Sequence, residues 1–324
     1  AKRLPAGVRF ALTGTPIENR LSELWSIFDF LMPGLLGTRE SFAKRFESPV
    51  EHAEGDSAAR LQALVSPFVL RRVKEDVVAD LPEKIEDTVM AQLTGEQRKL
   101  YLANQDRIAQ QVQHREAGEF KKDKLKVLAE LTKLRQICCD PRLHYEDYKA
   151  GSAKLDTCME LVHGALDGGH RILLFSQFTG MLDIIGKRLA KEDIAFLKLT
   201  GASSKESRAK MVAQFQAGEV PVFLISLKAG GVGLNLTAAD VVIHYDPWWN
   251  VAAQDQATDR AHRIGQQHTV TVYKLIAKDT IEERIMQMQE SKRDLVNSVL
   301  GGDGISSALF TREDVLALLG GDGR

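Results

Sequence analysis

Ile172-Leu173-Leu174-Phe175-Ser176 opens the part of the sequence that decides the fold. Four more short apolar runs follow it, with helical segments between them, at Ala195–Leu199, Val222–Ser226, Val241–Tyr245 and Val270–Ile276. Near-continuous apolar strands that alternate with helices are typical of a parallel sheet covered on both faces. We therefore predict an α/β fold with a parallel sheet flanked by helices.

Polar, small and aromatic residues follow these predicted strands at their carboxyl ends. They are Ser176-Gln177-Phe178, Thr200-Gly201, Leu227–Gly231 and Asp246–Trp249. In parallel sheets of this kind, ligands bind beyond the carboxyl ends of the strands. The pattern predicts a binding rim at this edge of the sheet.

The rim includes a glycine-rich turn, Ala229-Gly230-Gly231-Val232-Gly233-Leu234-Asn235. Backbone amides at Gly231 and Gly233 could approach phosphate oxygens closely because no side chain shields them. A plain turn also needs glycine, and with Lys228 beside it both interpretations stay open.

Two adjacent tryptophans, Trp248 and Trp249, stand beside a strand end and a proline. One interpretation is a platform against nucleic acid, since stacking of a base on an aromatic ring is worth about 1–3 kcal/mol. The other is that both rings fill the core. The residues alone do not separate the two.

A helix is predicted from Val251 to Arg263, because the segment contains no Gly or Pro and Gly265 can end it in a left-handed conformation. On such a helix Gln256, Arg260 and Arg263 share one face. Two planar cations on one face suit a polyanion whose charge grows during a reaction, as in phosphoryl transfer. A solvated face with two surface arginines is the alternative, and the residue types by themselves favour it.

The first half of the chain has a different character. Val8–Leu12 reads as a buried strand that ends in the turn Thr13-Gly14-Thr15-Pro16, and a helix is predicted over Leu21–Leu31. From about residue 31 to 148 strand signals vanish, and Glu96–Gln113 and Lys121–Ile137 show helical periodicity. We predict a mainly helical insertion there.

The predicted domain organisation has four parts. Residues 1–30 end one α/β lobe, 31–148 form the helical insertion, 149–300 form a second α/β lobe, and 301–324 form a linker and a short last helix.

A basic segment starts at Leu70-Arg71-Arg72-Val73-Lys74. Two interpretations are open, a solvated face or a contact with DNA or nucleotide, and the residue types favour the solvated face.

Composition adds further limits. The net charge of −1 over 324 residues means that any surface for nucleic acid must be a local patch. The three cysteines have no metal-ligand spacing and predict reduced, buried thiols. No apolar run approaches the roughly 20 residues that span a bilayer. We expect a soluble protein without a membrane partner, located in the cytoplasm, with the nucleoid or the nucleus as its site of action.

In combination these motifs resemble the C-terminal half of the Swi/Snf-type ATPases, a helicase-like branch of superfamily two that tracks along double-stranded DNA. The resemblance covers nearly the whole chain. Its most specific pieces are Leu12–Asn19, Leu70–Lys74, Leu81-Pro82-Glu83-Lys84, Leu134–Cys139, the glycine-rich turn and Asp259–Gln266.

The resemblance implies two RecA-like lobes that bind ATP and Mg2+ between them. It implies that Arg260 and Arg263 act as arginine fingers and that Gln256 helps to hold the nucleotide. It also implies a DNA-tracking surface, with Thr13, Gly14 and Thr15 coupling the ATP state to DNA. The remaining residues of that surface would be Ser176, Gln177, Thr200, Gly201, Lys228, Gly230, Asn235 and Trp249. Val251 stands where the family usually has proline, which leaves the start of the finger helix undecided.

Two motifs of the family are absent from this sequence. It contains no Gly-x-x-x-x-Gly-Lys-Ser/Thr loop and no apolar strand ending in an Asp-Glu pair. Because the chain also begins without Met inside a strand-like segment, we expect a fragment whose first lobe is missing and which hydrolyses little or no ATP alone.

Two classes of function remain. The first is a DNA-dependent ATPase that translocates on double-stranded DNA, with a strand-separating helicase as a near variant. The second is a non-catalytic module that recruits DNA or a partner such as a polymerase.

Overall fold

The computed structural model describes residues 5–13, 21–48, 57–70, 81–113, 117–230, 234–248, 251–288 and 312–320. The chain divides into two compact units. The first unit comprises Ala1–Val77, Trp249–Ala252 and Gln287–Leu309, and the second comprises Val78–Trp248, Ala253–Met286 and Phe310–Arg324.

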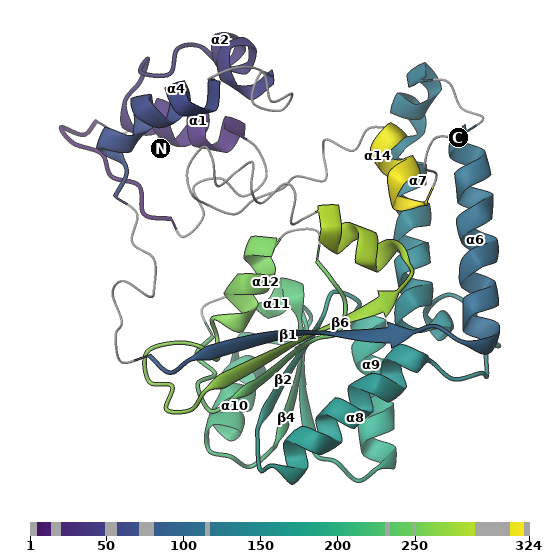
Figure 1. Cartoon of the computed structure of the whole chain (residues 1–324). Coiled ribbons are helices and arrows are strands. Elements are labelled where there is room, and N and C mark those ends of the chain that lie inside the picture. The colour runs from purple at the N-terminus through teal and green to yellow at the C-terminus, as the bar shows by residue number, and fades with distance from the viewer. Residues whose placement is uncertain are drawn as a thin grey trace. The chain divides into compact units, whose positions relative to one another are not determined.

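The second unit is built on one six-stranded sheet, in which every pair of neighbours is parallel and the order is β1-β6-β5-β2-β4-β3 (Figure 1). The strands are β1 (Lys84–Gln92), β2 (Ile172–Ser176), β3 (Phe196–Leu199), β4 (Val222–Ser226), β5 (Val241–His244) and β6 (Val270–Lys278). The five predicted strands are confirmed, with ends that differ by at most two residues.

Helices cover both faces of this sheet because successive strand residues point to opposite sides. Leu174 and Leu224 pack on one face against α8 (Ala153–Asp167) and α9 (Thr179–Lys191). Leu173 and Phe223 face the other side, where α10 (Lys205–Gln216), α11 (Leu227–Gly230) and α12 (Val251–Thr258) contribute core residues. The predicted α/β fold is therefore confirmed.

Strand β1 corrects the prediction that strands are absent between residues 31 and 148. It pairs with β6 from Lys84 opposite Val270 to Gln92 opposite Lys278. Most of its residues are exposed, and Glu86 forms ion pairs at 2.6 Å with both Lys84 and Lys274. An edge strand stabilised by cross-strand charges lacks the apolar run that identifies a buried strand.

The helical segment after β1 forms a pair, α6 (Gly95–Gln113) and α7 (Ala117–Cys139), as predicted (Figure 1). A short 3-10 helix, η3 (Pro141–Leu143), follows. The last helix, α14 (Arg312–Leu318), packs on α6, where Gln105 Nε2 donates to the Leu319 carbonyl at 2.7 Å. Arg284 Nη1 donates to the Leu318 carbonyl at 2.9 Å. Two side chains of the second unit thus bind carbonyls at the carboxyl end of α14.

The first unit is a small helical unit. Its elements are α1 (Leu21–Leu31), α2 (Arg39–Phe42), the π-helix η1 (Ala43–Glu47), α4 (Ser57–Val65) and the 3-10 helix η2 (Ser66–Phe68). Leu24, Phe28, Phe42 and Leu61 form the centre of its core. Across the described ranges of both units, no helix is long and apolar enough to cross a membrane.

The prediction of a buried strand at Val8–Leu12 is wrong for this structure. The segment is irregular, and Phe10 and Leu12 are 82% and 100% exposed. A strand needs a neighbour to bond its backbone groups, and the sheet pairs only the six strands given above within the described residues. Arg9 holds the segment to α1 instead, donating to the Phe30 carbonyl at 2.9 Å.

The three cysteines, at positions 138, 139 and 158, are unpaired in disulfides and buried, as predicted. Burial raises the pKa of the Cys158 thiol to about 12. A thiol with so high a pKa stays protonated at neutral pH, so this cysteine is an inert part of the core.

Candidate functional site

The segment with the two arginines does not form the predicted continuous helix. Helix α12 ends at Thr258, and turns follow it. The Arg260 N–H bonds the Ala257 carbonyl at 3.2 Å, three residues back, and the Arg260 carbonyl accepts from the Leu236 N–H at 2.9 Å. The chain therefore leaves the α-helical bonding pattern at Arg260, and the Leu236 N–H fixes the loop that follows. The prediction that Gln256, Arg260 and Arg263 share one helical face is therefore wrong.

We call residues 259–266 the arginine segment. His262 Nε2 lies 2.7 Å from the Pro82 carbonyl, ahead of β1, and Gln266 Nε2 donates to the Ala239 carbonyl at 2.7 Å, ahead of β5. Gly265 has φ +101°, the left-handed conformation that was predicted for it. The segment is thus a loop held from two sides by buried side chains.

The two arginines differ in their environment. Arg263 is exposed, whereas Arg260 is partly buried and its Nε has no hydrogen-bond partner. Burial, together with the nearby charge of Arg263, lowers the pKa of Arg260. A partly desolvated guanidinium with an unused donor suits an anionic ligand, which fits a nucleotide phosphate. Gln256 is partly buried on α12.

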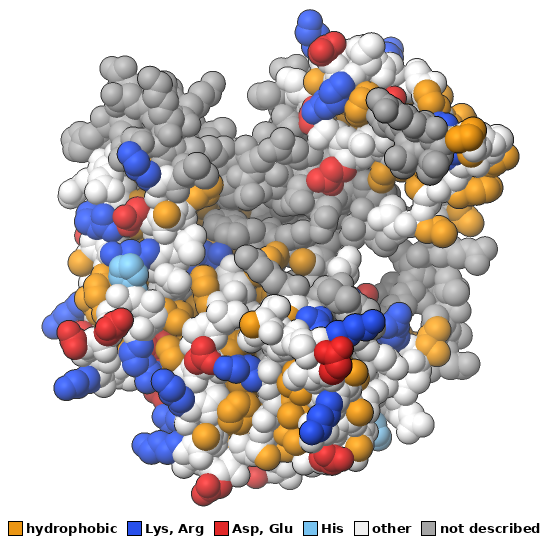
Figure 2. Space-filling model, turned by 180° about the vertical axis from the view of Figure 1, so that it is seen from behind, with side chains coloured by type: hydrophobic (Ala, Val, Ile, Leu, Met, Phe, Trp, Pro, Cys, Tyr) orange, Lys and Arg blue, Asp and Glu red, His pale blue; other side chains and the backbone are white. Residues whose placement is uncertain are grey.

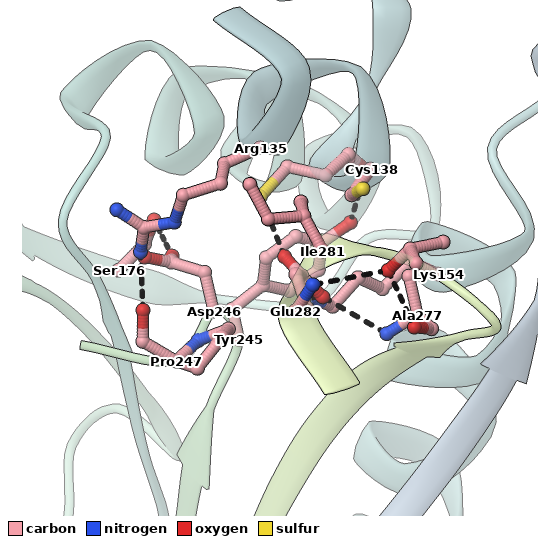
Figure 3. Close-up of polar contacts among 12 residues, drawn as sticks. Arg135, Cys138, Lys154, Ser176, Tyr245, Asp246, Pro247, Ala277, Ile281 and Glu282 are labelled. Carbon is pink, nitrogen blue, oxygen red and sulfur yellow. Dashed lines mark hydrogen bonds and ion pairs between the residues drawn. The ribbon is translucent and has the colours of Figure 1, made fainter. Parts of the chain in front are cut away.

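A second cluster lies where β2 and β5 end (Figure 3). We call it the Asp246 network, comprising Arg135, Ser176, Gln177, Asp246 and Pro247. Ser176 Oγ donates to Asp246 Oδ1 at 2.5 Å, and the Gln177 N–H lies 3.3 Å from both Asp246 oxygens. Arg135 Nη1 donates to Gln177 Oε1 at 3.2 Å, and Nη2 donates to the Pro247 carbonyl. The predicted residues Ser176 and Gln177 are therefore held in a buried polar site.

Asp246 is completely buried, and Arg135 is 2% exposed. Burial raises the pKa of Asp246, while the Arg135 charge and the Ser176 hydrogen bond act in the opposite direction. A buried carboxylate is stable only when a cation or donors compensate it. Arg135 and Asp246 thus depend on each other.

Other predicted residues lie at the same carboxyl edge. Thr200 directly follows β3 and begins a turn closed by the Ser203 N–H, which donates to its carbonyl at 3.1 Å; Gly201 is exposed. Lys228 and Gly230 belong to α11, which begins directly after β4. Asn235 is exposed.

Several predicted residues cannot be placed here. Gly14, Thr15, Gly231, Gly233 and Trp249 lie outside the described residues. Thr13 is exposed and belongs to the first unit. Of the tryptophan pair, Trp248 packs against the core cluster beside α12, as the core interpretation expects.

Sequence reasoning missed a buried ion pair. Lys154 at the start of α8 and Glu282 after β6 are both 0% exposed, with Nζ and Oε2 2.5 Å apart (Figure 3). It placed Asp246 in the predicted binding rim and Arg135 in a motif of the family resemblance, but it predicted no contact for either side chain. Charged residues in otherwise apolar surroundings were the available signal, but only the fold shows which charges meet.

The described residues contain no group of three or more His, Cys, Asp or Glu side chains placed to hold a metal ion. In Figure 2, Lys and Arg side chains are interspersed with Asp and Glu side chains over the visible face. A mixed surface of this kind agrees with the net charge of −1. Any recognition of an anion therefore depends on local groups such as Arg260.

Comparison with known proteins agrees with this architecture. Residues 1–143 match the SNF2-related domain, and residues 153–265 match the helicase conserved C-terminal domain. An uncharacterized ATP-dependent helicase of Mycoplasma pneumoniae is 40% identical over 98% of this chain and 30% of its own length. A putative ATP-dependent helicase/translocase of Bacillus subtilis, YwqA, is 41% identical over 94% of this chain and 34% of its own length. The chain thus spans about a third of the curated relatives that it matches.

Solved structures give the same result. The Sulfolobus solfataricus SWI2/SNF2 ATPase core in complex with dsDNA is 39% identical, with a TM-score of 0.59, over 90% of this chain and 62% of that chain. The C-terminal domain of the Sulfolobus solfataricus SWI2/SNF2 ATPase is 34% identical, with a TM-score of 0.57, over 68% of this chain and 91% of that chain. On these grounds the chain belongs to the Swi2/Snf2 family of ATP-dependent helicases and translocases.

Proposed function

We propose that this chain supplies the second motor lobe of an ATP-driven translocase on double-stranded DNA. The observation that carries the proposal is Arg260, a partly buried guanidinium whose Nε has no hydrogen-bond partner and whose pKa is lowered by burial and by Arg263. The Arg260 side chain as a whole is partly exposed, so an anion can reach its guanidinium. A nucleotide phosphate is such an anion.

In this proposal Arg260 and Arg263 act as arginine fingers, and Gln256 helps to bind the nucleotide. ATP with Mg2+ supplies the transferable phosphoryl group and the metal charge. Arg260 binds the developing negative charge and holds it in a site with reduced access to water. The anchors of the arginine segment at Pro82 and Ala239 keep the guanidinium in position, so that little reorganisation is needed during the reaction.

The rest of the ATPase site would come from a first lobe of the same protein. This sequence contains neither the phosphate-binding loop nor the Asp-Glu strand of the family, and the described residues offer no cluster of acidic ligands for Mg2+. Hydrolysis then requires closure of the two lobes, and the chain by itself has little or no activity.

The carboxyl edge of the sheet is the proposed DNA-tracking surface. Ser176 is the last residue of β2, and Gln177, Thr200 and Lys228 come shortly after β2, β3 and β4 at this edge. The related SWI2/SNF2 ATPase core has been solved with double-stranded DNA, which supports DNA as the partner. We also assign Thr13, Gly14, Thr15, Gly230, Asn235 and Trp249 to this proposed DNA contact. A further DNA-bound protein, such as a polymerase, is a second proposed partner.

The test is ATP hydrolysis with and without double-stranded DNA. It compares the full-length gene product that contains this chain, the chain alone, and the full-length protein with Arg260→Ala. We expect stimulation by DNA only in the full-length protein, with a loss of about a thousandfold or more in kcat for Arg260→Ala. Arg188→Ala is the matched control, because Arg188 is 40% exposed and pairs with Glu192 on a helix surface.

Normal turnover in Arg260→Ala would remove the finger role. An absence of turnover in every protein, together with retained DNA binding, would favour the non-catalytic recruiting module instead.

A further inference from the structure

Arg135 joins one element to two loops that are distant in sequence. It lies on α7, yet Nη1 donates to Gln177 Oε1 at 3.2 Å, and Nη2 donates to the Pro247 carbonyl (Figure 3). Its guanidinium also lies over the Phe178 ring, 5.8 Å from the centroid. One buried side chain thus fixes the loop after β2 and the loop after β5 to the helical pair.

The contact also decides how the Gln177 amide is oriented. A guanidinium is only a donor, so it can face only the oxygen of the amide. Gln177 Oε1 is therefore turned toward Arg135, and Gln177 Nε2 is left buried without a hydrogen-bond partner. An unused donor in a buried position is costly, so the contact with Arg135 holds the amide in this orientation at the expense of one hydrogen bond.

Asp246 fixes the backbone of the loop after β2. Its carboxylate accepts from Ser176 Oγ and from the Gln177 backbone N–H, so the backbone of the same loop is fixed while Arg135 fixes the side chain. With Arg135 as the cation and Asp246 as the anion, the buried network is balanced in charge. The loop after β2 therefore has one main-chain anchor and one side-chain anchor.

We propose that Arg135 is a positioning residue for DNA contact. It locks the side chain of Gln177 in the loop after β2, and it ties the loops after β2 and β5 to the α6–α7 pair. This inference rests on the proposed function and deepens it, because it assigns to the helical pair control over the DNA-tracking loops. Arg135 itself does not need to touch DNA.

The experiment measures DNA-stimulated ATP hydrolysis of the full-length protein over a range of duplex concentrations. For Arg135→Met we expect the DNA concentration at half-maximal stimulation to rise about tenfold, as for the loss of one charge-assisted contact. We expect kcat at saturating DNA to change less than about twofold, since the arginine segment is held by other anchors. Arg107→Met is the matched control, because Arg107 is an arginine of the same helical pair whose ion pair with Glu130 is only partly buried.

Arg135→Met leaves the Asp246 carboxylate buried without its cation and could unfold the protein. Arg135→Met combined with Asp246→Asn removes both charges while keeping an acceptor for Ser176. If this double variant folds and keeps the raised DNA requirement, the effect comes from the Gln177 amide. If it restores normal DNA dependence, charge balance alone explains Arg135 and the proposal is overturned.

Gln177→Met gives a second check. If Arg135 acts through Gln177, the pair Arg135→Met and Gln177→Met should be no worse than either change alone. Additive losses would overturn the inference. If the wild-type protein shows no DNA-stimulated turnover, the proposed function fails, and hydrogen exchange at residues 176–178 then decides on Arg135. Faster exchange in the Arg135→Met, Asp246→Asn variant than in Asp246→Asn alone supports the positioning role of Arg135, and equal exchange in the two variants refutes it.

Discussion

The ion pair between Lys154 and Glu282 should be among the most important polar contacts for the stability of the second unit. Both side chains are 0% exposed, and Nζ and Oε2 are 2.5 Å apart. Glu282 also accepts the Ala277 N–H at 2.9 Å, and Lys154 Nζ lies 5.3 Å from the centroid of the Tyr245 ring. Burial alone would lower the pKa of Lys154, but the Glu282 carboxylate outweighs it and the pKa is raised. Lys154 therefore keeps its positive charge at neutral pH.

Lys154→Met keeps the volume of the side chain but leaves the Glu282 carboxylate buried without its cation. The loss of one partner of a fully buried pair costs about 3–5 kcal/mol in the free energy of unfolding. With a urea m-value of about 2–3 kcal/mol/M, the unfolding midpoint should fall by about 1–2 M. Lys154→Met combined with Glu282→Gln removes both charges and keeps an acceptor for the Ala277 N–H, so most of the loss should be recovered.

The assay is urea unfolding of the chain followed by circular dichroism at neutral pH. Arg107→Met is the control, because the Arg107–Glu130 pair is 41% and 33% exposed, and a surface pair contributes less than about 1 kcal/mol. A midpoint for Lys154→Met within the range of this control would refute the reasoning. So would a double variant less stable than Lys154→Met alone.

Two further predictions concern acid and the last helix. Burial lowers the pKa of His244 to about 3 from its usual 6.5, so between these pH values the unfolded chain takes up a proton that the folded chain does not. The free energy of unfolding should then fall with decreasing pH by up to about 1.4 kcal/mol per pH unit. Urea unfolding at neutral and acidic pH should show a smaller fall for His244→Phe, and an unchanged fall would contradict this prediction. Gly320 has φ +81°, and an added Cβ would meet the Arg284 guanidinium at 2.6 Å. Gly320→Ala should therefore weaken the contact between Arg284 and the end of α14 and speed hydrogen exchange in α14. Gly169→Ala is the control, since Gly169 has φ +75° but nothing within 4 Å; equal effects at α14 would count against the Arg284 contact.

Much of the fold could be predicted from local patterns. Ile172–Ser176 and Val222–Ser226 were predicted with the bounds observed, because both faces of a central parallel strand are buried and the apolar run is continuous. Helix α1 was predicted for a comparable reason, since its buried residues Leu24 and Phe28 recur at helical spacing. Each of these signals is contained within a single element.

The predictions that failed depended on partners elsewhere in the chain. β1 is a strand because β6 pairs with it, although its own residues are mostly exposed. α12 ends at Thr258, and nothing between residues 251 and 263 signals that stop. The loop that follows is held by bonds to distant residues, such as the Leu236 N–H on the Arg260 carbonyl, which local helix propensity does not reveal.

Local patterns in the sequence establish the alternation of strands and helices and the polar residues after the strands, and the family resemblance implies a nucleotide contact for the two arginines. The folded chain is needed to see that Arg260 lies in a loop with an unused donor and that Arg135 meets Gln177 and Pro247. It also shows that Lys154 pairs with Glu282. The physical reason is that strand and helix patterns arise from neighbouring residues, whereas buried charges and hydrogen bonds need partners that chain folding brings together from distant positions.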